Sequence, residues 1–541
     1  MSQVEKQLAT ASETQDGSES GNGPMPRQIP YIIVNEICER FSFYGMRNVL
    51  TPFLISTLLL FMPVAERAGE AKHVFHTFVI GVFFFPLLGG WLADRFFGKY
   101  NTVFWLSLIY CIGHACLAYF ENNINGFYFG LFLIAFGSGG IKPLVSSFVG
   151  DQFDRTNKSK AKLVYDFFYW SINVGSFFAS LLIPILLRDY GPALAFGVPG
   201  VLMFIATMVF WSGKKKYVHV PPAAPNPDSF TRVARTALLA AAPGQARPGL
   251  SIARLGAAAA VVCLCLSPQW GFVIAACSAL VLLLAFGGIG IGMQIERARG
   301  IHPDAAVEGV RAVLRILIIF ALVTPFFSLF DQKASTWVVQ ATAMEKPSWF
   351  LPAQMQALNP ALVMLLIPFN NLLLYPLLGR MGLEVTALRR MTIGIGFSAL
   401  AWIVIGAIQL KMDGGQPMSI TWQILPYVLL TMGEVLVSAT GLEFAYSQAP
   451  ASMKGTIMSL WLLSTTVGNL WVLIVNAGVK NDAVNAYIQT TGFSVTAFQM
   501  FFFAAFAAVA MLAFGWYARR YRMVDNYRAT PVAAGIAAPS A

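Results

Sequence analysis

Four charged residues occur within twelve positions of an otherwise strongly apolar stretch near the amino end: Glu36, Glu39, Arg40 and Arg47. On a helix with about 100° per residue, Glu36, Arg40 and Arg47 fall within about 40° of one another, with Glu39 about 60° to the other side. The stripe rises about 16 Å, roughly half the thickness of a bilayer's hydrocarbon core. Each intramembrane charge costs about 2.5–3.5 kcal/mol, so we favour a proton or substrate pathway over a static ion-pair network.

Further polar residues stand in the apolar stretches that follow. Lys142 comes after a glycine-rich run and precedes Pro143, which loosens a helix beside an intramembrane lysine. Tyr169 and Asn173 are spaced i, i+4 and so share one face of a helix. A snorkelling lysine and ordinary hydrogen bonds between helices are the alternative interpretations of these residues.

The composition indicates a membrane protein. Of 541 residues, 57% are hydrophobic and 12% charged, whereas a soluble protein carries about a quarter charged residues. The net charge of +11 lies largely in short loops, where it sets membrane orientation, and we expect no nucleic-acid partner. Basic residues recur on alternate loops, which predicts that both termini face the cytoplasm.

Fourteen apolar runs are long enough to span a bilayer. They lie near residues 30–60, 73–94, 101–120, 126–150, 162–187, 192–212, 251–267, 270–294, 309–341, 352–378, 391–411, 419–447, 455–477 and 493–518. We therefore predict a disordered tail over 1–28, a six-helix bundle over 29–213, a linker with an inserted helix pair over 214–300, a second six-helix bundle over 301–521, and a tail over 522–541. Many secondary transporters consist of six plus six spans with a site between the halves.

Other classes of protein fit the sequence less well. The chain has no HExxH, P-loop or GxSxG motif, so we expect neither an enzyme nor a metal or other cofactor. The six cysteines lie in apolar segments without zinc-ligand spacing. A channel or receptor is a further alternative, but acids and bases at several depths suit alternating occupancy better than a simple pore.

Several motifs together resemble those of known transporters. GGWLADRFFGK (89–99) resembles the loop signature of the major facilitator superfamily. EICERF (36–41) matches the ExxERF motif of its proton-dependent oligopeptide transporter family, and 137–153 and 168–177 resemble that family's two signatures. FSLFDQKASTW (327–337), Glu434 and Trp461 also match. The resemblance covers about residues 29–520 and implies a major facilitator fold of twelve core helices plus a two-helix insertion.

The resemblance also implies roles for individual residues. Glu36, Glu39 and Arg40 would couple proton movement to transport, and His76 matches a second-span histidine that part of the family uses in proton handling. A packed, non-titrating histidine is the alternative for His76. The residues that would line a peptide pocket are Tyr44, Arg47, Lys142, Tyr169, Asn173, Asn359, Glu434, Ser438 and Trp461.

A gate and two departures complete the comparison with the family's pattern. Asp331 would pair with Arg47 across the two halves as a gate on the extracellular side, and we count Lys333 with this gate. Phe43 and Phe83 stand where many relatives have tyrosine, so hydroxyl contacts are absent there and we expect a different substrate preference.

The charges agree with a zwitterionic substrate. The likeness places four acids in the membrane, Glu36, Glu39, Asp331 and Glu434, with four bases, Arg40, Arg47, Lys142 and Lys333. A short peptide needs a cation for its carboxylate, such as Arg47 or Lys142, and an anion for its ammonium group, such as Glu434. Asn173 and Asn359 can bind its amide as donor and acceptor. Ordinary core packing is the alternative for Trp461.

The resemblance, with which these charges agree, implies a proton-coupled symporter that imports di- and tripeptides by alternating access. Its expected partners are short peptides, protons and the lipid bilayer, and we expect it to act as a monomer in the bacterial inner membrane. A proton-coupled carrier of another small solute, such as nitrate, is the alternative. Glu434 argues against that alternative, because a carrier of bare anions gains little from an acid.

Overall fold

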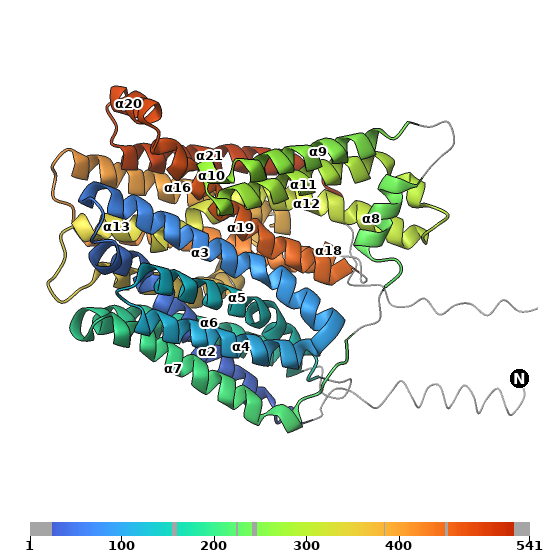
Figure 1. Ribbon diagram of the computed structural model, residues 1–541, viewed down its shortest axis with the longest axis horizontal. Coiled ribbons are helices and arrows are strands. Elements are labelled where there is room, and N and C mark those ends of the chain that lie inside the picture. Colours follow the sequence, from blue (N-terminus) through green and yellow to red (C-terminus); the bar gives the residue numbers. More distant parts are fainter. Residues whose placement is uncertain are drawn as a thin grey trace, which may run out of the picture. The chain divides into compact units, whose positions relative to one another are not determined.

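The protein is almost entirely helical in the computed structural model, which describes residues 24–153, 160–222, 226–240, 246–382, 385–448 and 453–523 (Figure 1). Within these ranges no β-strand forms, and twelve helical segments are long and apolar enough to cross a membrane. One of them, Val64–Tyr119, contains two helices, α3 (Val64–Leu92) and α4 (Gly98–Tyr119). The prediction of an all-α membrane protein is confirmed.

Helix α2 (Ile29–Phe53) is not among these twelve segments, because its charged stripe lowers its hydropathy. It is nevertheless 25 residues long, and much of its surface is buried, including Glu36, Glu39 and Arg47. With α3 and α4 counted separately, a helix stands at each of the fourteen predicted spans in the part of the chain that the structure describes.

The chain forms two compact units, of which unit 1 comprises Met1–Arg67, Phe84–Ala224 and Trp349–Met364. Besides α2, α4 and the end of α3, its helices are α5 (Ile124–Gly150), α6 (Ala161–Tyr190) and α7 (Pro192–Ser212). α2 packs against α6 and α7, and α4 packs against α5 and α7. Phe53, Phe127 and Phe196 are buried where α2, α5 and α7 meet, with ring centroids 4.9–5.3 Å apart. These aromatic contacts form a core for unit 1.

Unit 2 comprises Ala68–Phe83, Pro225–Ser348 and Leu365–Ala541. Its main helices are α12 (Asp304–Asp331), α13 (Thr336–Ala343), α16 (Ala387–Asp413), α17 (Ile424–Glu434), α18 (Thr440–Gln448), α19 (Lys454–Val479) and α21 (Val495–Ala518), while α15 (Tyr375–Arg380) is short. Helix α14 (Leu358–Phe369) begins in unit 1 and ends in unit 2. Trp337 packs against Trp402 and Tyr427 in a fully buried aromatic cluster.

The inserted pair consists of α9 (Pro248–Cys265) and α11 (Phe272–Gln294), joined by the single turn α10 (Ser267–Trp270). The two long helices pack along each other, as Figure 1 shows. Ile274 and Cys277 of α11 contact Ile80 of α3 and Leu470 and Leu473 of α19 in one apolar cluster. The pair, itself part of unit 2, therefore packs on α3 and α19 through apolar side chains, as its composition suggests.

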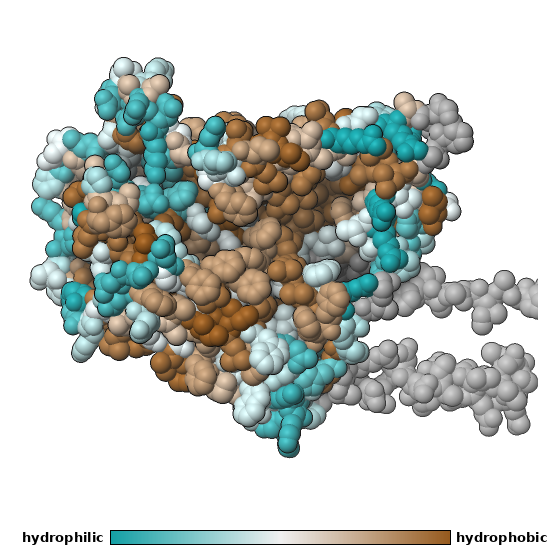
Figure 2. Space-filling model, in the orientation of Figure 1, coloured by the Kyte–Doolittle hydropathy of each residue, from teal (hydrophilic) through white to brown (hydrophobic). Residues whose placement is uncertain are grey.

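Two short helices lie outside the predicted spans. The first, α8 (Phe230–Leu239), buries Val233, Ala234 and Ala237 on one face. The second, α20 (Asp482–Thr490), begins where the Asn481 side chain accepts hydrogen bonds from two backbone amides. On the face shown in Figure 2, apolar residues cover much of the middle of the helices, and hydrophilic residues gather near α8 and α20. Both helices are amphipathic and too short for a hydropathy search to detect.

The predicted span 309–341 is not one continuous helix. α12 ends at Asp331, a 3₁₀ turn follows over Gln332–Ala334, and α13 begins at Thr336. Ser335 between them has φ −126° and ψ −79°, outside the helical region. The interruption falls beside the predicted gate residues Asp331 and Lys333.

Helices α3 and α5 approach each other closely at two glycines. A Cβ atom added to Gly139 would lie 2.7 Å from the backbone oxygen of Phe85, and one added to Gly89 would lie 2.1 Å from the backbone oxygen of Gly139. Because backbone atoms cannot yield as a flexible side chain can, any larger residue must push the helices apart.

We expect Gly139→Leu to destabilise the protein by at least about 1–3 kcal/mol through overpacking. Gly287→Leu in α11 is the matched control, because nothing lies within 4 Å of an added Cβ there. Thermal unfolding in detergent, followed by size-exclusion chromatography, measures the difference. Equal stability of the two variants would contradict the close contact between α3 and α5.

Candidate functional site

The charged stripe of α2 forms a buried cluster in which two acids share one base. The Arg40 Nε donates to Glu36 Oε1 at 2.6 Å and lies 3.1 Å from Glu39 Oε2. Both carboxylates are fully buried. Neither Glu39 oxygen, nor the second Glu36 oxygen, has a hydrogen-bond partner among the described residues. One guanidinium group therefore faces two carboxylates with spare acceptor capacity, an arrangement that can take up a proton.

Lys142 of α5 belongs to the same unit and lies against an aromatic ring of α2. Its Nζ is 3.6 Å from the centroid of the Phe43 ring. The face of an aromatic ring attracts a cation such as the Lys142 ammonium group. Phe43, one of the two departures from tyrosine, thus contacts a predicted substrate-binding residue through its ring, and Phe43 also packs edge-on against Tyr44.

Arg47 is also buried, one turn beyond Tyr44 on α2. The next residue, Asn48, donates to Ser180 Oγ of α6 at 2.6 Å, and its backbone oxygen accepts from Gln356 Nε2 at 3.1 Å. These contacts fix the rotation of α2 at the level of Arg47. Arg47 lies in unit 1 and Asp331 in unit 2, so their pairing as a gate stays a prediction.

The remaining predicted pocket residues of unit 1 lie on α6 and α14. Asn173 Nδ2 donates to the backbone oxygen of Tyr169 at 3.0 Å, which confirms that the two residues share one face of α6. Tyr169 is 42% exposed, whereas Asn173 is buried. Asn359 is half-buried near the start of α14. Their contribution to a peptide pocket stays a prediction.

A second buried polar network lies in unit 2 and joins three helices. His76 Nδ1 of α3 lies 2.6 Å from Asn469 Oδ1 of α19, and Asn469 Nδ2 donates to Asp331 Oδ2 of α12 at 2.8 Å. His76 Nε2 lies 3.0 Å from Ser335 Oγ, in the break between α12 and α13. The predicted proton-handling histidine and the predicted gate acid are therefore linked through one amide.

The hydrogen bonds determine which nitrogen of His76 carries the proton. Asn469 Nδ2 donates to Asp331 and to the backbone oxygen of Thr465, so Asn469 Oδ1 must accept from His76 Nδ1. Neutral His76 then accepts from the Ser335 hydroxyl at Nε2. If His76 gains a proton there, Ser335 can accept instead and donate to the backbone oxygen of Gln332, 3.4 Å away. Each ring nitrogen of His76 thus has a hydrogen-bond partner in this network.

Sequence reasoning missed Asn469 and Ser335. Asn469 is one of few amides in an apolar helix, spaced four residues after Thr465, and such a residue is a signal for contacts between helices. Ser335 lies four residues after Asp331, but the helical face that this spacing predicts is interrupted by the 3₁₀ turn. In that turn Lys333 is buried, with its Nζ 3.2 Å from the centroid of the Phe330 ring.

The predicted residues of α17 to α19 occupy a distorted part of unit 2. Glu434 is the last residue of α17, and a π-helical turn over Val435–Ala439 follows it and contains Ser438. π-Helical turns are frequent at functional sites. Trp461 is buried against Phe320 and Phe327, with centroids 5.3 and 5.7 Å from its own. This packing supports the alternative interpretation of Trp461, and its role in a pocket stays a prediction.

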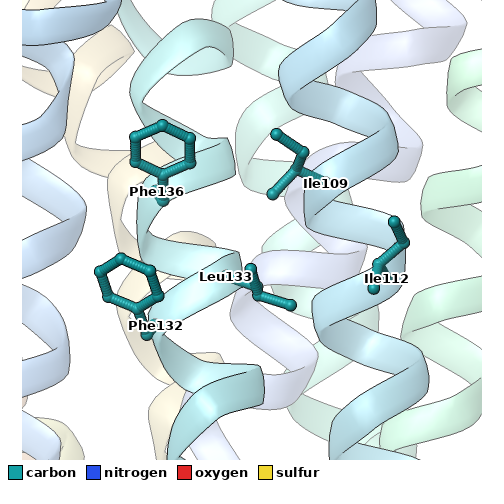
Figure 3. A pocket seen from close by; sticks show the side chains of 5 residues that line it. All are labelled: Ile109, Ile112, Phe132, Leu133 and Phe136. Carbon is teal, nitrogen blue, oxygen red and sulfur yellow. The ribbon is translucent and has the colours of Figure 1, made fainter.

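An apolar hollow between α4 and α5 has no charged or hydrogen-bonding side chains in its lining. It measures about 230 Å³ and is lined by Ile109, Ile112, Phe132, Leu133 and Phe136, which Figure 3 shows on two neighbouring helices. Ile112 and Phe132 are more than half exposed. With only hydrocarbon side chains, the hollow offers nothing that could bind the ends of a peptide.

Known proteins share both the sequence and the fold. A family model described as "POT family" matches residues 100–492, and one described as "MFS/sugar transport protein" matches residues 19–163. "Solute carrier family 15 member 2" of Mus musculus is 32% identical over 435 residues, 77% of this chain and 54% of that protein. "Peptide transporter 3" of Caenorhabditis elegans is 30% identical over 487 residues, covering 86% and 61%. The chain thus spans about half the length of these relatives.

Solved structures match over nearly their whole length. The crystal structure of an auto inhibited POT family peptide transporter has 68% sequence identity and a TM-score of 0.91, covering 93% of this chain and 99% of that one. The in meso crystal structure of the POT family transporter PepTSo has 64% identity and the same TM-score, covering 93% and 100%. The prediction of the family and of the major facilitator fold is confirmed. This chain is an integral membrane protein that belongs to the POT family.

Proposed function

We propose that the protein is a proton-coupled symporter that imports di- and tripeptides by alternating access. The observation that carries the proposal is the buried cluster of Glu36, Glu39 and Arg40, in which two acids share one base. The relatives named as peptide transporters support the class of substrate. We further propose that residues 29–213 and 301–521 act as the two moving halves, in a single chain, with both termini facing the cytoplasm of a bacterial inner membrane.

The charge of the α2 cluster makes it a proton-binding site. With both carboxylates ionised and Arg40 charged, the three groups carry one net negative charge, which is costly inside a membrane. Either a proton or a second cation can balance it. Lys142 lies within electrostatic range of Glu36 and Glu39, so protonation of one carboxylate would release Lys142 to bind a peptide carboxylate.

We expect Glu36→Gln or Glu39→Gln to abolish uptake driven by a proton gradient, because an amide cannot exchange a proton. Driven uptake is measured as the accumulation of dipeptide in proteoliposomes with an imposed pH gradient. Glu66→Gln, an exposed acid at the start of α3, is the control. A variant that still concentrates dipeptide would show that its acid is not essential for coupling.

The peptide's two ends would be bound by charges from both units. Arg47 and Lys142 would bind the carboxylate and Glu434 the ammonium group, while Asn173 and Asn359 would bind the amide. Tyr44, Tyr169, Ser438 and Trp461 would complete the pocket. Arg47 would pair with Asp331 to close the outer gate, with Lys333 beside it.

We expect Glu434→Gln to weaken the binding of peptides with a free amino terminus by about tenfold or more, because it replaces a charge-assisted hydrogen bond by a neutral one. Amino-terminally acetylated peptides should lose little further affinity. Binding titrations of both peptide types on the wild type and the variant compare the two effects. Equal losses would mean that Glu434 supports the site without binding the ammonium group.

We expect Asn469→Leu to change the pH dependence of transport, because it cuts the link between His76 and Asp331. It should also cost about 1–3 kcal/mol of stability, since buried polar groups lose their partner. Asn476→Leu, in the same helix, is the matched control, because Asn476 is buried and accepts from Gln499 at 3.0 Å. If the pH dependence of transport in Asn469→Leu equals that of the wild type, the network of His76, Asn469 and Asp331 does not take part in proton coupling.

A further inference from the structure

The segment after α7 is anchored to the end of unit 1. We call residues 214–222 the strap; they begin with the turn Lys214–Lys216 and continue to Pro222. Tyr217 is buried, with ring centroids 6.0 Å from Tyr100 and 5.1 Å from Phe148. Burial raises the pKa of the Tyr217 hydroxyl, so that this side chain stays neutral and acts as an apolar anchor.

Polar contacts hold the strap on both sides of Tyr217. The Val218 amide donates to Gln152 Oε1 at 2.9 Å, and Gln152 Nε2 donates back to the Val218 oxygen at 3.3 Å. Lys216 Nζ donates to Tyr31 Oη at 2.5 Å and lies 4.5 Å from the centroid of that ring. The strap therefore has a defined position, and so do the groups that it presents.

A pocket of about 240 Å³ lies between the strap and the start of α4. Its polar lining groups are Lys99, Asn101 and His219, and rings of Phe97 and Tyr100 form part of its wall. His219 is held by a 2.9 Å hydrogen bond between its Nε2 and the backbone oxygen of Lys214. The pocket thus combines hydrogen-bonding groups with an aromatic wall, which suits a ligand that is part polar and part apolar.

Cations outnumber acids around this pocket. Arg95, Lys99 and the three lysines of the strap outnumber the acids Asp94 and Asp151 beside them in the sequence or in contact with them, and Lys99 Nζ donates to Asp151 at 2.7 and 2.9 Å. Lys214 Nζ lies 5.7 Å from the Tyr100 ring. Lys215 is exposed and makes no hydrogen bond or ion pair with the described residues. The surplus positive charge predicts an anionic ligand.

The surroundings of the pocket identify the kind of anion. The lysines directly follow the apolar span of α7, and large aromatic side chains are exposed at the same end of unit 1. Trp91, Phe96, Phe97 and Trp211 are each 54–57% exposed. Exposed aromatic rings beside a lysine run are typical of the level where lipid headgroups lie. A free anion would gain nothing from the aromatic wall.

We propose that the strap and the start of α4 form a binding site for an anionic phospholipid such as phosphatidylglycerol. The Lys214–Lys216 turn neutralises the lipid phosphate, and Asn101 and His219 bind polar groups of the headgroup. The exposed rings pack against the glycerol and the first methylenes of the acyl chains. Lipid bound here also holds the strap, where the chain leaves unit 1 for unit 2.

The test is lipid binding by the purified full-length protein, measured by native mass spectrometry. Phosphatidylglycerol is titrated against phosphatidylcholine with the same acyl chains, and against inorganic phosphate. We expect a preference for phosphatidylglycerol that falls by at least about tenfold in the variant Lys214→Gln/Lys215→Gln/Lys216→Gln, since each lysine near an anionic lipid contributes roughly fivefold. Asn101→Leu, which leaves the charge unchanged, should reduce the preference as well.

The matched control removes three exposed cations elsewhere, Arg254, Arg380 and Lys411. It should keep the preference, provided that all variants elute as monodisperse protein. Equal losses in the control and the strap variant would overturn the proposal in favour of non-specific charge attraction. Competition by millimolar inorganic phosphate as effective as that by the lipid would overturn it in favour of a free-anion site.

Discussion

The burial of charge on α2 is the constraint on which the rest of unit 1 depends. Arg40 is tolerable in an apolar helix only beside Glu36 and Glu39, and removing one partner of a buried pair costs about 3–5 kcal/mol. The cluster therefore fixes which face of α2 points inward. The contacts of Asn48 with Ser180 and Gln356 maintain the same rotation two turns further along. The cluster contains one carboxylate more than it has guanidinium groups, which is the basis of the proposed proton coupling.

Unit 2 also contains a buried acid, Asp331. The Asn469 amide and the His76 imidazole connect it to Ser335. An asparagine is suited to this position because it donates to a carboxylate with one end and accepts from a histidine with the other. A proton at His76 Nε2 would leave Nδ1 donating to Asn469 and would add positive charge to the network that contains Asp331. Unit 1 holds its buried charges in the Glu36, Glu39 and Arg40 cluster, and unit 2 holds Asp331 in a hydrogen-bonded network with Asn469 and His76.

Much of this could be predicted from the sequence, because hydropathy and helical spacing are local properties. They identified the fourteen helices and the charged face of α2, and the motifs identified the family. The contact between His76 and Asn469 joins residues 393 positions apart, so only packing could reveal it. The interruption at Ser335 was missed because hydropathy does not report backbone direction, and α8 and α20 were missed because they are short and amphipathic.

The departures from regular helix coincide with residues that the family pattern marks. The 3₁₀ turn after Asp331 and the π-helical turn after Glu434 both release backbone groups from the regular ladder of hydrogen bonds. Non-helical backbone at membrane depth is tolerated only where protein or a polar cavity satisfies it. Helix-terminal residues of this kind absorb the changes in backbone angle when packed elements move. A transporter that alternates between two states needs irregular turns next to its charged residues. A change in the charge of such a residue can then bend the helix at the neighbouring turn.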